Sequence, residues 1–228
     1  MIKISIIIMA YNEIGGLETV FNEINSTLKD LSKKYEIIII DDGSTDGTRE
    51  IADRLSLKYE NVNTIHHKKN RGLGEVYRTG FLHAKGEFVS FFPADGQYPA
   101  AIIRQFIKFI ENYDLILGYL PRRNCSFVAK CLSKMEKLLY RLFFGPMPKF
   151  QGILMFRRAI LKKIELNTKE ERAWTIVMEF IIKAQKRKYR IKNIPTEIRH
   201  RMSGKSKVNN LRTIWANLKG MLRLCNYI

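Results

Sequence analysis

The chain has 228 residues, 46% of them hydrophobic, which suits one sizeable globular domain with a buried core and at most a small appendage. Its 40 lysines and arginines outnumber 22 acids and give a formal net charge of +18, which indicates a polyanionic partner: nucleic acid, an anionic membrane face or a phosphorylated ligand. The three cysteines lack metal-ligand or disulfide spacing, which predicts reduced thiols in a cytosolic protein. No apolar run approaches the length of about 18 residues that a membrane span requires.

The first half of the chain alternates between short apolar runs and helix-like stretches. The first apolar run is short and leads directly into polar residues, so it predicts a first strand and not a signal peptide. We expect strands at residues 4–8, 37–40, 62–65, 88–92 and 115–117, and helices at residues 17–31 and 48–59. Because the runs are apolar at successive positions, the strands should be covered on both faces, as in a parallel α/β sheet.

After residue 119 the pattern changes to basic amphipathic helices. Residues 126–144 alternate an apolar side with a side of lysine and arginine, and residues 174–186 form a helix of mixed pattern. Near the end, apolar residues recur at spacings of three and four, with Trp215 among them: Val208, Leu211, Trp215, Leu218, Leu222 and Cys225. Such helices either pack on the core or lie on a membrane surface, and the membrane is favoured more for the last helix than for the first.

Residues with useful chemistry follow each of the first four predicted strands, whose ends converge on one edge of a parallel sheet. They are residues 10–13, 41–47, 70–74 and 95–97. Asp95 ends an apolar run, where a carboxylate is costly to bury without a partner. The ring of Tyr11 can stack on a base, the acids can accept hydrogen bonds from a base or a ribose, and glycines let the backbone approach a ligand.

These four segments, in this order, resemble the inverting family-2 glycosyltransferases, and within them the dolichol-phosphate mannose synthase-like branch that uses polyisoprenyl-phosphate acceptors. The resemblance covers about residues 3–207 and extends to Gly152, residues 156–158 and residues 201–207. It implies a single α/β nucleotide-diphospho-sugar-transferase domain of the Rossmann-like GT-A type. We therefore expect a mostly parallel central sheet, with the basic amphipathic helices added to it.

The resemblance also implies roles for single residues. The catalytic residues would be Asp95, Gln97 and Arg201, and two of them, Asp95 and Gln97, would hold Mg²⁺ or Mn²⁺ on the donor diphosphate. The residues that would bind nucleotide and phosphates are Ala10, Tyr11, Glu13, Asp42, Gly72, Arg78, Arg122, Arg123, Ser206 and Lys207. Asp42 would read the base, and the basic residues near the end would cover phosphates. A leaving nucleoside diphosphate gains charge as the sugar bond breaks, and cations stabilise that charge.

The chain departs from the family pattern in three places. Pro93 stands where the family has a first acid, Met9 replaces a frequent proline, and residues 148–151 contain no acid. Mg²⁺ commonly uses one or two carboxylates together with substrate phosphates and water. Asp95 and a diphosphate therefore suffice in principle, and we expect poor metal affinity without the donor. A relative with a weakened metal site and little activity is an alternative.

A hydroxyl acceptor requires a general base, whereas a phosphate acceptor already carries an anionic nucleophilic oxygen. Glu170 and Glu171 have the pattern of a solvated loop, and Glu179 can orient basic residues as well as act as a base. The lack of an obvious base and the basic surface favour inverting transfer to a polyisoprenyl phosphate, by a peripheral enzyme on the cytoplasmic face of an anionic membrane. The alternative is transfer to a sugar hydroxyl of a glycan acceptor in surface-polysaccharide synthesis.

For the domain organisation, we expect a catalytic domain at residues 1–207, with a nucleotide-binding half at about 1–120 and an acceptor half at about 121–207. Residues 208–228 would form a C-terminal amphipathic helix that associates with the membrane.

Two other classes of protein fit poorly. A dinucleotide-binding oxidoreductase would have a glycine-rich loop after the first strand, where residues 11–13 stand, and Tyr77 takes the place of the third glycine of a later glycine run. A nucleic-acid-binding module is supported by charge alone, with no recognised motif, and acids along the predicted edge would repel phosphates. We expect no nucleic-acid partner.

Overall fold

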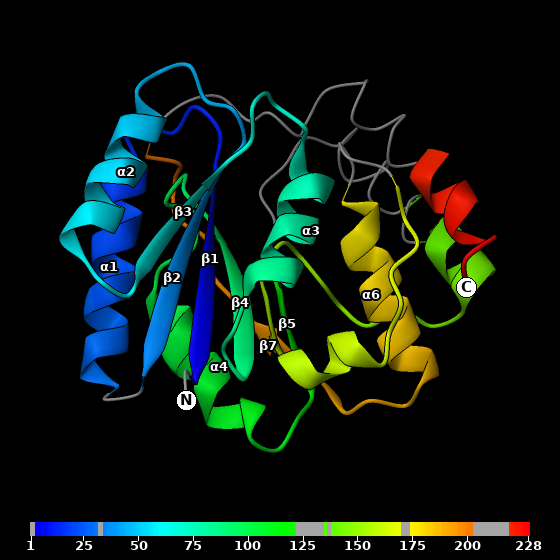
Figure 1. Cartoon of the computed structure of the whole chain (residues 1–228). Coiled ribbons are helices and arrows are strands. Elements are labelled where there is room, and N and C mark those ends of the chain that lie inside the picture. Colours follow the sequence, from blue (N-terminus) through cyan, green and yellow to red (C-terminus); the bar gives the residue numbers. More distant parts are fainter. Residues whose placement is uncertain (1–2, 32–33, 122–134, 136–137, 170–173, 203–218) are drawn as a thin grey trace.

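The computed structural model describes residues 3–31, 34–121, 135, 138–169, 174–202 and 219–228 (Figure 1). These residues form a seven-stranded sheet with the order β3-β2-β1-β4-β6-β5-β7. The strands are β1 (Ile4–Ala10), β2 (Tyr35–Asp41), β3 (Val62–His66), β4 (Phe88–Pro93), β5 (Leu115–Tyr119), β6 (Leu154–Arg157) and β7 (Ile191–Pro195). Only β6 runs antiparallel to its neighbours, β4 and β5. The five predicted strands and the mostly parallel sheet are confirmed.

Helices cover both faces of the sheet, as the apolar strands predict. The helices are α1 (Leu17–Asp30), α2 (Thr48–Lys58), α3 (Leu73–His83), α4 (Ala101–Ile110) and α6 (Thr175–Lys186), with a 3-10 helix η1 (Arg158–Lys162). Along β1, Ile6 and Ile8 pack with α1, α2 and α4, whereas Ile7 and Met9 pack with α3 and α6 (Figure 1). Successive side chains of β1 are therefore buried in two separate cores on opposite faces of the sheet. A shift by one residue would exchange these faces, so the burial fixes the register of β1 against its neighbours.

A close contact between α3 and β4 fixes the position of α3, which begins at the carboxyl end of the strands. The ring of Phe91 on β4 lies 4.5 Å from that of Tyr77 and 5.3 Å from that of Phe81, both on α3. A Cβ atom on Gly80 would lie 2.5 Å from the Phe91 ring, so only glycine allows this approach. The packing fixes α3, and therefore the loop that precedes it.

The carboxyl ends of β1, β2, β3 and β4 lie at the same edge of the sheet. Ala10 is in register with Asp41, which is in register with His66, and Met9 is in register with Pro93. The segments that follow these strands therefore lie side by side. In the following, this edge is called the rim, and it comprises residues 10–13, 41–47, 67–72 and 94–97.

Two described helical segments of the basic amphipathic pattern expose apolar side chains. Residues 138–144 are helical; Tyr140 is buried in the core that α6 shares, while Leu138 and Leu142 are 57% and 71% exposed. In residues 219–224, Met221 and Leu224 are buried, but Leu222 is 57% exposed. Each segment thus has a buried side and a second, exposed apolar side. Among the described helices, none is long and apolar enough to cross a bilayer.

Candidate active site

The first two loops of the rim are locked together by hydrogen bonds through Asn12. Its backbone N–H donates to Ser44 Oγ at 2.9 Å, and its Oδ1 accepts the Thr45 N–H at 2.8 Å. The backbone of Asn12 is left-handed, with φ of 52°, a conformation that asparagine tolerates better than most residues. Next to it, the Glu13 N–H donates to Thr48 Oγ1 at 2.8 Å. The backbone that carries Tyr11 and Glu13 is therefore fixed by the turn after β2.

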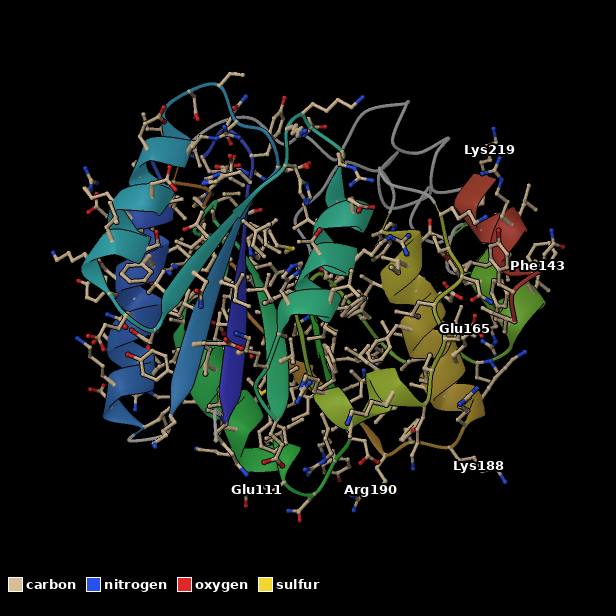
Figure 2. All side chains as sticks on the ribbon, viewed as in Figure 1. Glu111, Phe143, Glu165, Lys188, Arg190 and Lys219 are labelled. Carbon is tan, nitrogen blue, oxygen red and sulfur yellow. The ribbon has the colours of Figure 1, made fainter. Side chains whose placement is uncertain are left out.

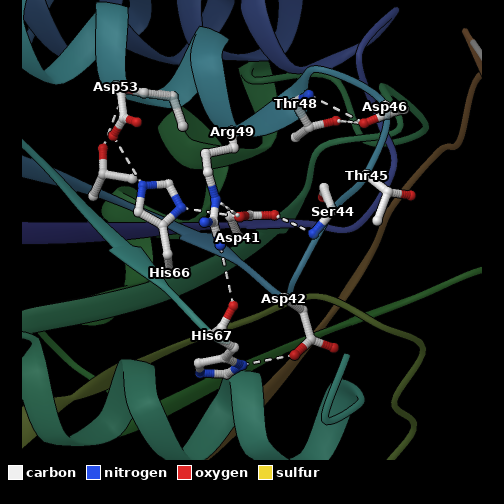
Figure 3. A network of polar contacts seen from close by, with 12 residues as sticks. Asp41, Asp42, Ser44, Thr45, Asp46, Thr48, Arg49, Asp53, His66 and His67 are labelled. Atoms are coloured by element: carbon white, nitrogen blue, oxygen red, sulfur yellow. Dashed lines mark hydrogen bonds and ion pairs between the residues drawn. The ribbon is translucent and has the colours of Figure 1, made fainter. Parts of the chain in front are cut away.

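Asp41 holds the turn after β2 and the start of α2 (Figure 3). Its fully buried carboxylate accepts the Ser44 N–H at 2.9 Å, Arg49 Nε at 3.2 Å and His66 Nδ1 at 2.9 Å. Burial alone would raise the pKa of Asp41, but the hydrogen bonds from Ser44, His66 and Arg49 together lower it below its ordinary value. The other ring nitrogen of His66 lies 2.8 Å from the carboxylate of Asp53. These contacts indicate a structural role for Asp41.

Asp42, the predicted base reader, holds the loop before α3. Its oxygens accept hydrogen bonds from four groups: His67 Nδ1 at 2.6 Å, Asn70 Nδ2 at 3.0 Å, the Arg71 N–H at 2.9 Å and the Gly72 N–H at 2.7 Å. Because the carboxylate is 3% exposed and has these partners, a base could reach it only by replacing one of them. Base reading by Asp42 remains a prediction, and its structural role is the stronger observation.

The lone acid after β4 forms an ion pair at the centre of the rim. Asp95 is 5% exposed; its Oδ1 accepts the Gln97 N–H at 3.0 Å, and its Oδ2 lies 2.8 Å from Arg201 Nη2. The second nitrogen of the same guanidinium, Nη1, lies 3.4 Å from Glu13 Oε1. Three residues that the sequence placed in one site, from three distant segments, therefore meet in the structure.

Residues 199–202 cross the rim as a strap. The Arg199 N–H donates to the Gln97 carbonyl at 2.8 Å, and the Met202 N–H donates to the Asp95 carbonyl at 3.0 Å. Gly96 has φ of 74°, and a Cβ there would lie 2.6 Å from Met202 Sδ, so this contact requires glycine. The strap thus presents Arg201 to the rim.

The strap is anchored outside the site by a pair that sequence reasoning missed. The guanidinium of Arg199 lies 3.0 Å and 2.6 Å from the two carboxylate oxygens of Glu23 on α1. The hydrogen bond from Arg199 also lowers the pKa of Glu23. No local pattern joins residues that lie so far apart in the sequence, so the pairing could not be read from it.

Arg78, predicted to bind the substrate or nucleotide, holds the loop before α6, and its role toward a ligand stays a prediction. Its Nη2 donates to the Thr168 carbonyl, and its Nε lies 3.3 Å from Glu75 Oε2. The fully buried Glu179 accepts the N–H groups of Asn167 and Thr168, each at 2.8 Å. Of the two roles considered for Glu179, the contacts favour the structural one, because its carboxylate holds this loop and pairs with Lys183 at 2.6 Å.

Apart from Arg78, the predicted site residues divide into those that the structure describes and those that it does not. Eight lie on the rim or on the strap that crosses it: Ala10, Tyr11, Glu13, Asp42, Gly72, Asp95, Gln97 and Arg201. Six residues that the sequence proposed for the site or as a base lie outside the described part of the chain: Arg122, Arg123, Glu170, Glu171, Ser206 and Lys207. Val208, Leu211, Trp215 and Leu218 of the predicted last helix also lie outside it. Positive charge also gathers beyond the end of β3, where an open cavity of about 510 Å³ is lined by His66, His67, Lys68, Lys69 and Arg71.

The side chains at Asp95 suit a divalent metal only in part. A carboxylate and an amide oxygen, from Asp95 and Gln97, are the hard ligands that Mg²⁺ and Mn²⁺ prefer. Within the described ranges, however, no three His, Cys, Asp or Glu side chains cluster as a metal site. Pro93 occupies the last position of β4, where it offers no ligand. A metal held here would therefore take its other ligands from a bound diphosphate and from water.

Comparison with known proteins identifies the family. The family model described as Glycosyl transferase family 2 matches residues 5–165. This chain belongs to that family. A dolichol-phosphate mannosyltransferase of Pyrococcus furiosus is 32% identical to it over 99% of the chain and 64% of the relative. A dolichyl-phosphate beta-glucosyltransferase of Saccharomyces cerevisiae is 34% identical over 50% of the chain and 36% of the relative. The chain thus spans less than two thirds of the length of these family-2 relatives.

A solved structure supports the fold. Glucosyl-3-phosphoglycerate synthase from Mycobacterium tuberculosis, in complex with Mn²⁺, UDP and glucosyl-3-phosphoglycerate, superposes with a TM-score of 0.73 at 16% identity. The match covers 98% of this chain and 80% of that one. Together with the sheet order, it confirms the expected GT-A fold for this family-2 glycosyltransferase.

Proposed function

We propose that this chain transfers one sugar, with inversion, from a nucleotide-diphospho-sugar to a polyisoprenyl phosphate. The observation that carries the proposal is the meeting of Glu13, Asp95 and Arg201 on the rim of a family-2 glycosyltransferase. The names of two relatives, a dolichol-phosphate mannosyltransferase and a dolichyl-phosphate glucosyltransferase, support the acceptor class.

On the donor side, each rim residue has a role in the proposal. Tyr11 stacks on the base, and Gly72 lets the backbone approach the nucleotide closely. Asp95 and Gln97 hold Mg²⁺ or Mn²⁺ together with the donor diphosphate. The metal, when bound, stabilises the charge that develops on the leaving nucleoside diphosphate. Arg201 and Lys207 would supply positive charge to the donor phosphates, and the Ser206 hydroxyl would donate a hydrogen bond to them.

The proposed reaction is a direct displacement. An oxygen of the acceptor phosphate attacks the anomeric carbon on the side opposite to the diphosphate. The bond from that carbon to the diphosphate oxygen breaks, and the nucleoside diphosphate leaves with the electron pair. Because the attacking oxygen is already anionic, no side chain needs to remove a proton. The engagement of Glu179 with Asn167, Thr168 and Lys183 agrees with a site that works without this residue as a base.

On the acceptor side, we propose that the protein lies on the cytoplasmic face of the membrane without spanning it. Leu142, Phe143 and Leu222 are exposed, and Arg141, Lys219 and Arg223 neighbour them in sequence. Figure 2 shows Phe143 and Lys219 on the same side of the molecule. Apolar side chains beside basic ones suit the boundary of an anionic bilayer, where each lysine or arginine contributes about 1 kcal/mol.

The domain division belongs to the same proposal. Residues 1–120 would bind the donor, because the rim lies within them. Residues 121–207 would form the acceptor half, and residues 208–228 would add a membrane-associating helix.

A thermal-shift screen tests the donor class first. UDP-, GDP- and dTDP-sugars are each added with Mg²⁺ or Mn²⁺, and the melting temperature is recorded. A ligand that binds only the folded state stabilises it, by about 2.7 kcal/mol at a hundred times its dissociation constant. We expect one donor class to raise the melting temperature more than the other two. No shift with any donor would contradict the proposal.

Separate replacement of Glu170 and Glu171 by glutamine distinguishes the two acceptor classes. A lipid-phosphate enzyme should tolerate both changes, whereas an enzyme that acts on a sugar hydroxyl should lose about 100-fold or more in rate when its base is removed. Loss of activity in one variant only, with an unchanged melting temperature, would favour the glycan acceptor of surface-polysaccharide synthesis.

A further inference from the structure

The guanidinium of Arg201 lies between two acids at the place where the donor site needs a cation. It is 2.8 Å from Asp95 Oδ2 and 3.4 Å from Glu13 Oε1, and the side chains of Arg201 and Asp95 are 19% and 7% exposed. One positive charge therefore faces two negative ones in a largely buried setting. The protein supplies this cation itself, from the strap.

A divalent metal on Asp95 would compete with this guanidinium. Mg²⁺ binds about 2.1 Å from its oxygen ligands. An ion on Asp95 Oδ2 would therefore lie only a few ångströms from Arg201 Nη2, which is 2.8 Å from the same oxygen. The other oxygen, Oδ1, already accepts the Gln97 N–H at 3.0 Å. Because like charges at this separation repel strongly where water is scarce, the two cations oppose each other's binding.

Arg201 can leave Asp95 without a change in the backbone. Its neighbours Arg199 and Met202 are tied to the carbonyls of Gln97 and Asp95 at 2.8 Å and 3.0 Å. The pair between Arg199 and Glu23 holds the strap from the other side. With the backbone held on both sides, release of the carboxylate would require rotation of the Arg201 side chain alone.

We propose that Arg201 is a resident counter-cation that the metal and the donor diphosphate displace together. In the free protein, Arg201 pairs with Asp95 and Glu13 and keeps the affinity for a divalent metal low. When the nucleoside diphosphate arrives, its phosphates offer the guanidinium a new anionic partner, and Asp95 becomes free for the metal. Metal and nucleotide therefore bind with positive coupling, and Arg201 carries that coupling. The nucleotide part of this inference rests on the proposed function.

The test measures binding of Mn²⁺ to the full chain by the loss of the free-ion signal in electron paramagnetic resonance. Without nucleotide, we expect Arg201→Gln to bind Mn²⁺ about tenfold more tightly than the unchanged protein, because a repelling positive charge is removed. Arg190→Gln is the matched control: Arg190 pairs with Asp114 at 3.3 Å, ahead of β7 and β5 and thus at the opposite edge of the sheet. Its Mn²⁺ affinity should equal that of the unchanged protein. The double variant Arg201→Gln with Asp95→Asn should lose the gain.

Equal or weaker Mn²⁺ binding by a folded Arg201→Gln protein would overturn the proposal. If that variant does not fold, the unchanged protein still decides the matter. Its Mn²⁺ affinity, corrected for the Mn²⁺ that the nucleotide binds without protein, should rise at least about tenfold with UDP, GDP or dTDP. An affinity independent of all three would overturn the coupling. Calorimetry with UDP, GDP and dTDP separates the two hypotheses. Failure to bind any of the three nucleotides would contradict the proposed function, whereas the nucleotide-free Mn²⁺ comparison would still test Arg201.

Discussion

The carboxylate of Asp42 and the ring of His67 form a buried hydrogen bond of 2.6 Å that joins the end of β2 to the segment after β3. His67 Nε2 continues to Thr79 Oγ1 on α3 at 2.9 Å. Two successive hydrogen bonds, between Asp42 and His67 and between His67 and Thr79, therefore connect the rim to α3. This side of the rim, where we propose that the nucleotide binds, is held by these hydrogen bonds together with the turns that precede the helices.

Replacement of Asp42 by alanine should reduce the free energy of unfolding by about 3 kcal/mol, because buried donors lose a charged acceptor. Urea denaturation measures the change. Asp53→Ala provides the comparison: Asp53 also pairs with a histidine, at 2.8 Å, but its side chain is 54% exposed, so its loss should cost at most about 1 kcal/mol. Equal losses in the two variants would show that burial of Asp42 does not matter.

The lowered pKa of Asp41 makes a prediction about acid stability. A carboxyl group whose pKa is lower in the folded than in the unfolded protein stabilises the fold above its unfolded pKa, and this contribution is lost as the pH falls through the folded pKa. The unchanged protein should therefore exceed Asp41→Asn in stability most at neutral pH, and the difference should shrink in the acid range. Urea titrations from pH 7 to pH 3 measure it, and a difference independent of pH would contradict the assignment.

Most of the sheet could be predicted because β1, β2, β4 and β5 are short, mostly apolar runs, and β3 places the β-branched Val62 and Ile65 between two helices. The antiparallel strand β6 was missed because it is only four residues long and inserts between β4 and β5, a placement that local pattern does not encode. Strand β7 was missed because its burial is mixed along its length.

The sequence predicted which residues share the site better than it predicted which groups each of them contacts. The resemblance placed Glu13, Asp95 and Arg201 in one site, and they meet. Sequence reasoning assigned Asp42 to a ligand, although four protein groups already contact it, because no pattern tells whether a carboxylate is satisfied internally. The role of His67 was missed, although a pair of adjacent histidines follows the third apolar run and marks this segment as polar and unusual.

Replacement of Asp95 by alanine should abolish metal-dependent turnover. The change removes the carboxylate that would hold the metal on the diphosphate, so a loss of at least about 100-fold is expected. Initial rates with Mg²⁺ and Mn²⁺ measure it. Asp114→Ala removes an acid that also pairs with an arginine, ahead of β5, and should keep the rate. Near-normal activity of Asp95→Ala would refute the metal assignment.

Replacement of Leu142 by serine should weaken binding to anionic vesicles by about 30-fold, since burial of a leucine side chain contributes about 2 kcal/mol. Vesicle flotation at low and high salt measures the bound fraction. Leu57→Ser is the matched control, because Leu57 is 89% exposed on α2, which lies across the molecule from α6 and the C-terminal helix (Figure 1). Binding that does not respond to salt, or equal effects of both changes, would argue against the proposed membrane surface.

One measurement tests the central claim directly. The protein is incubated with a radiolabelled nucleotide-sugar, chosen by the thermal-shift screen, Mn²⁺ and either a polyisoprenyl phosphate in anionic vesicles or a soluble glycan. We expect the label to enter the organic phase only with the lipid phosphate, as a product of inverted anomeric configuration. Transfer of the label to the glycan, with none to the lipid, would contradict the account.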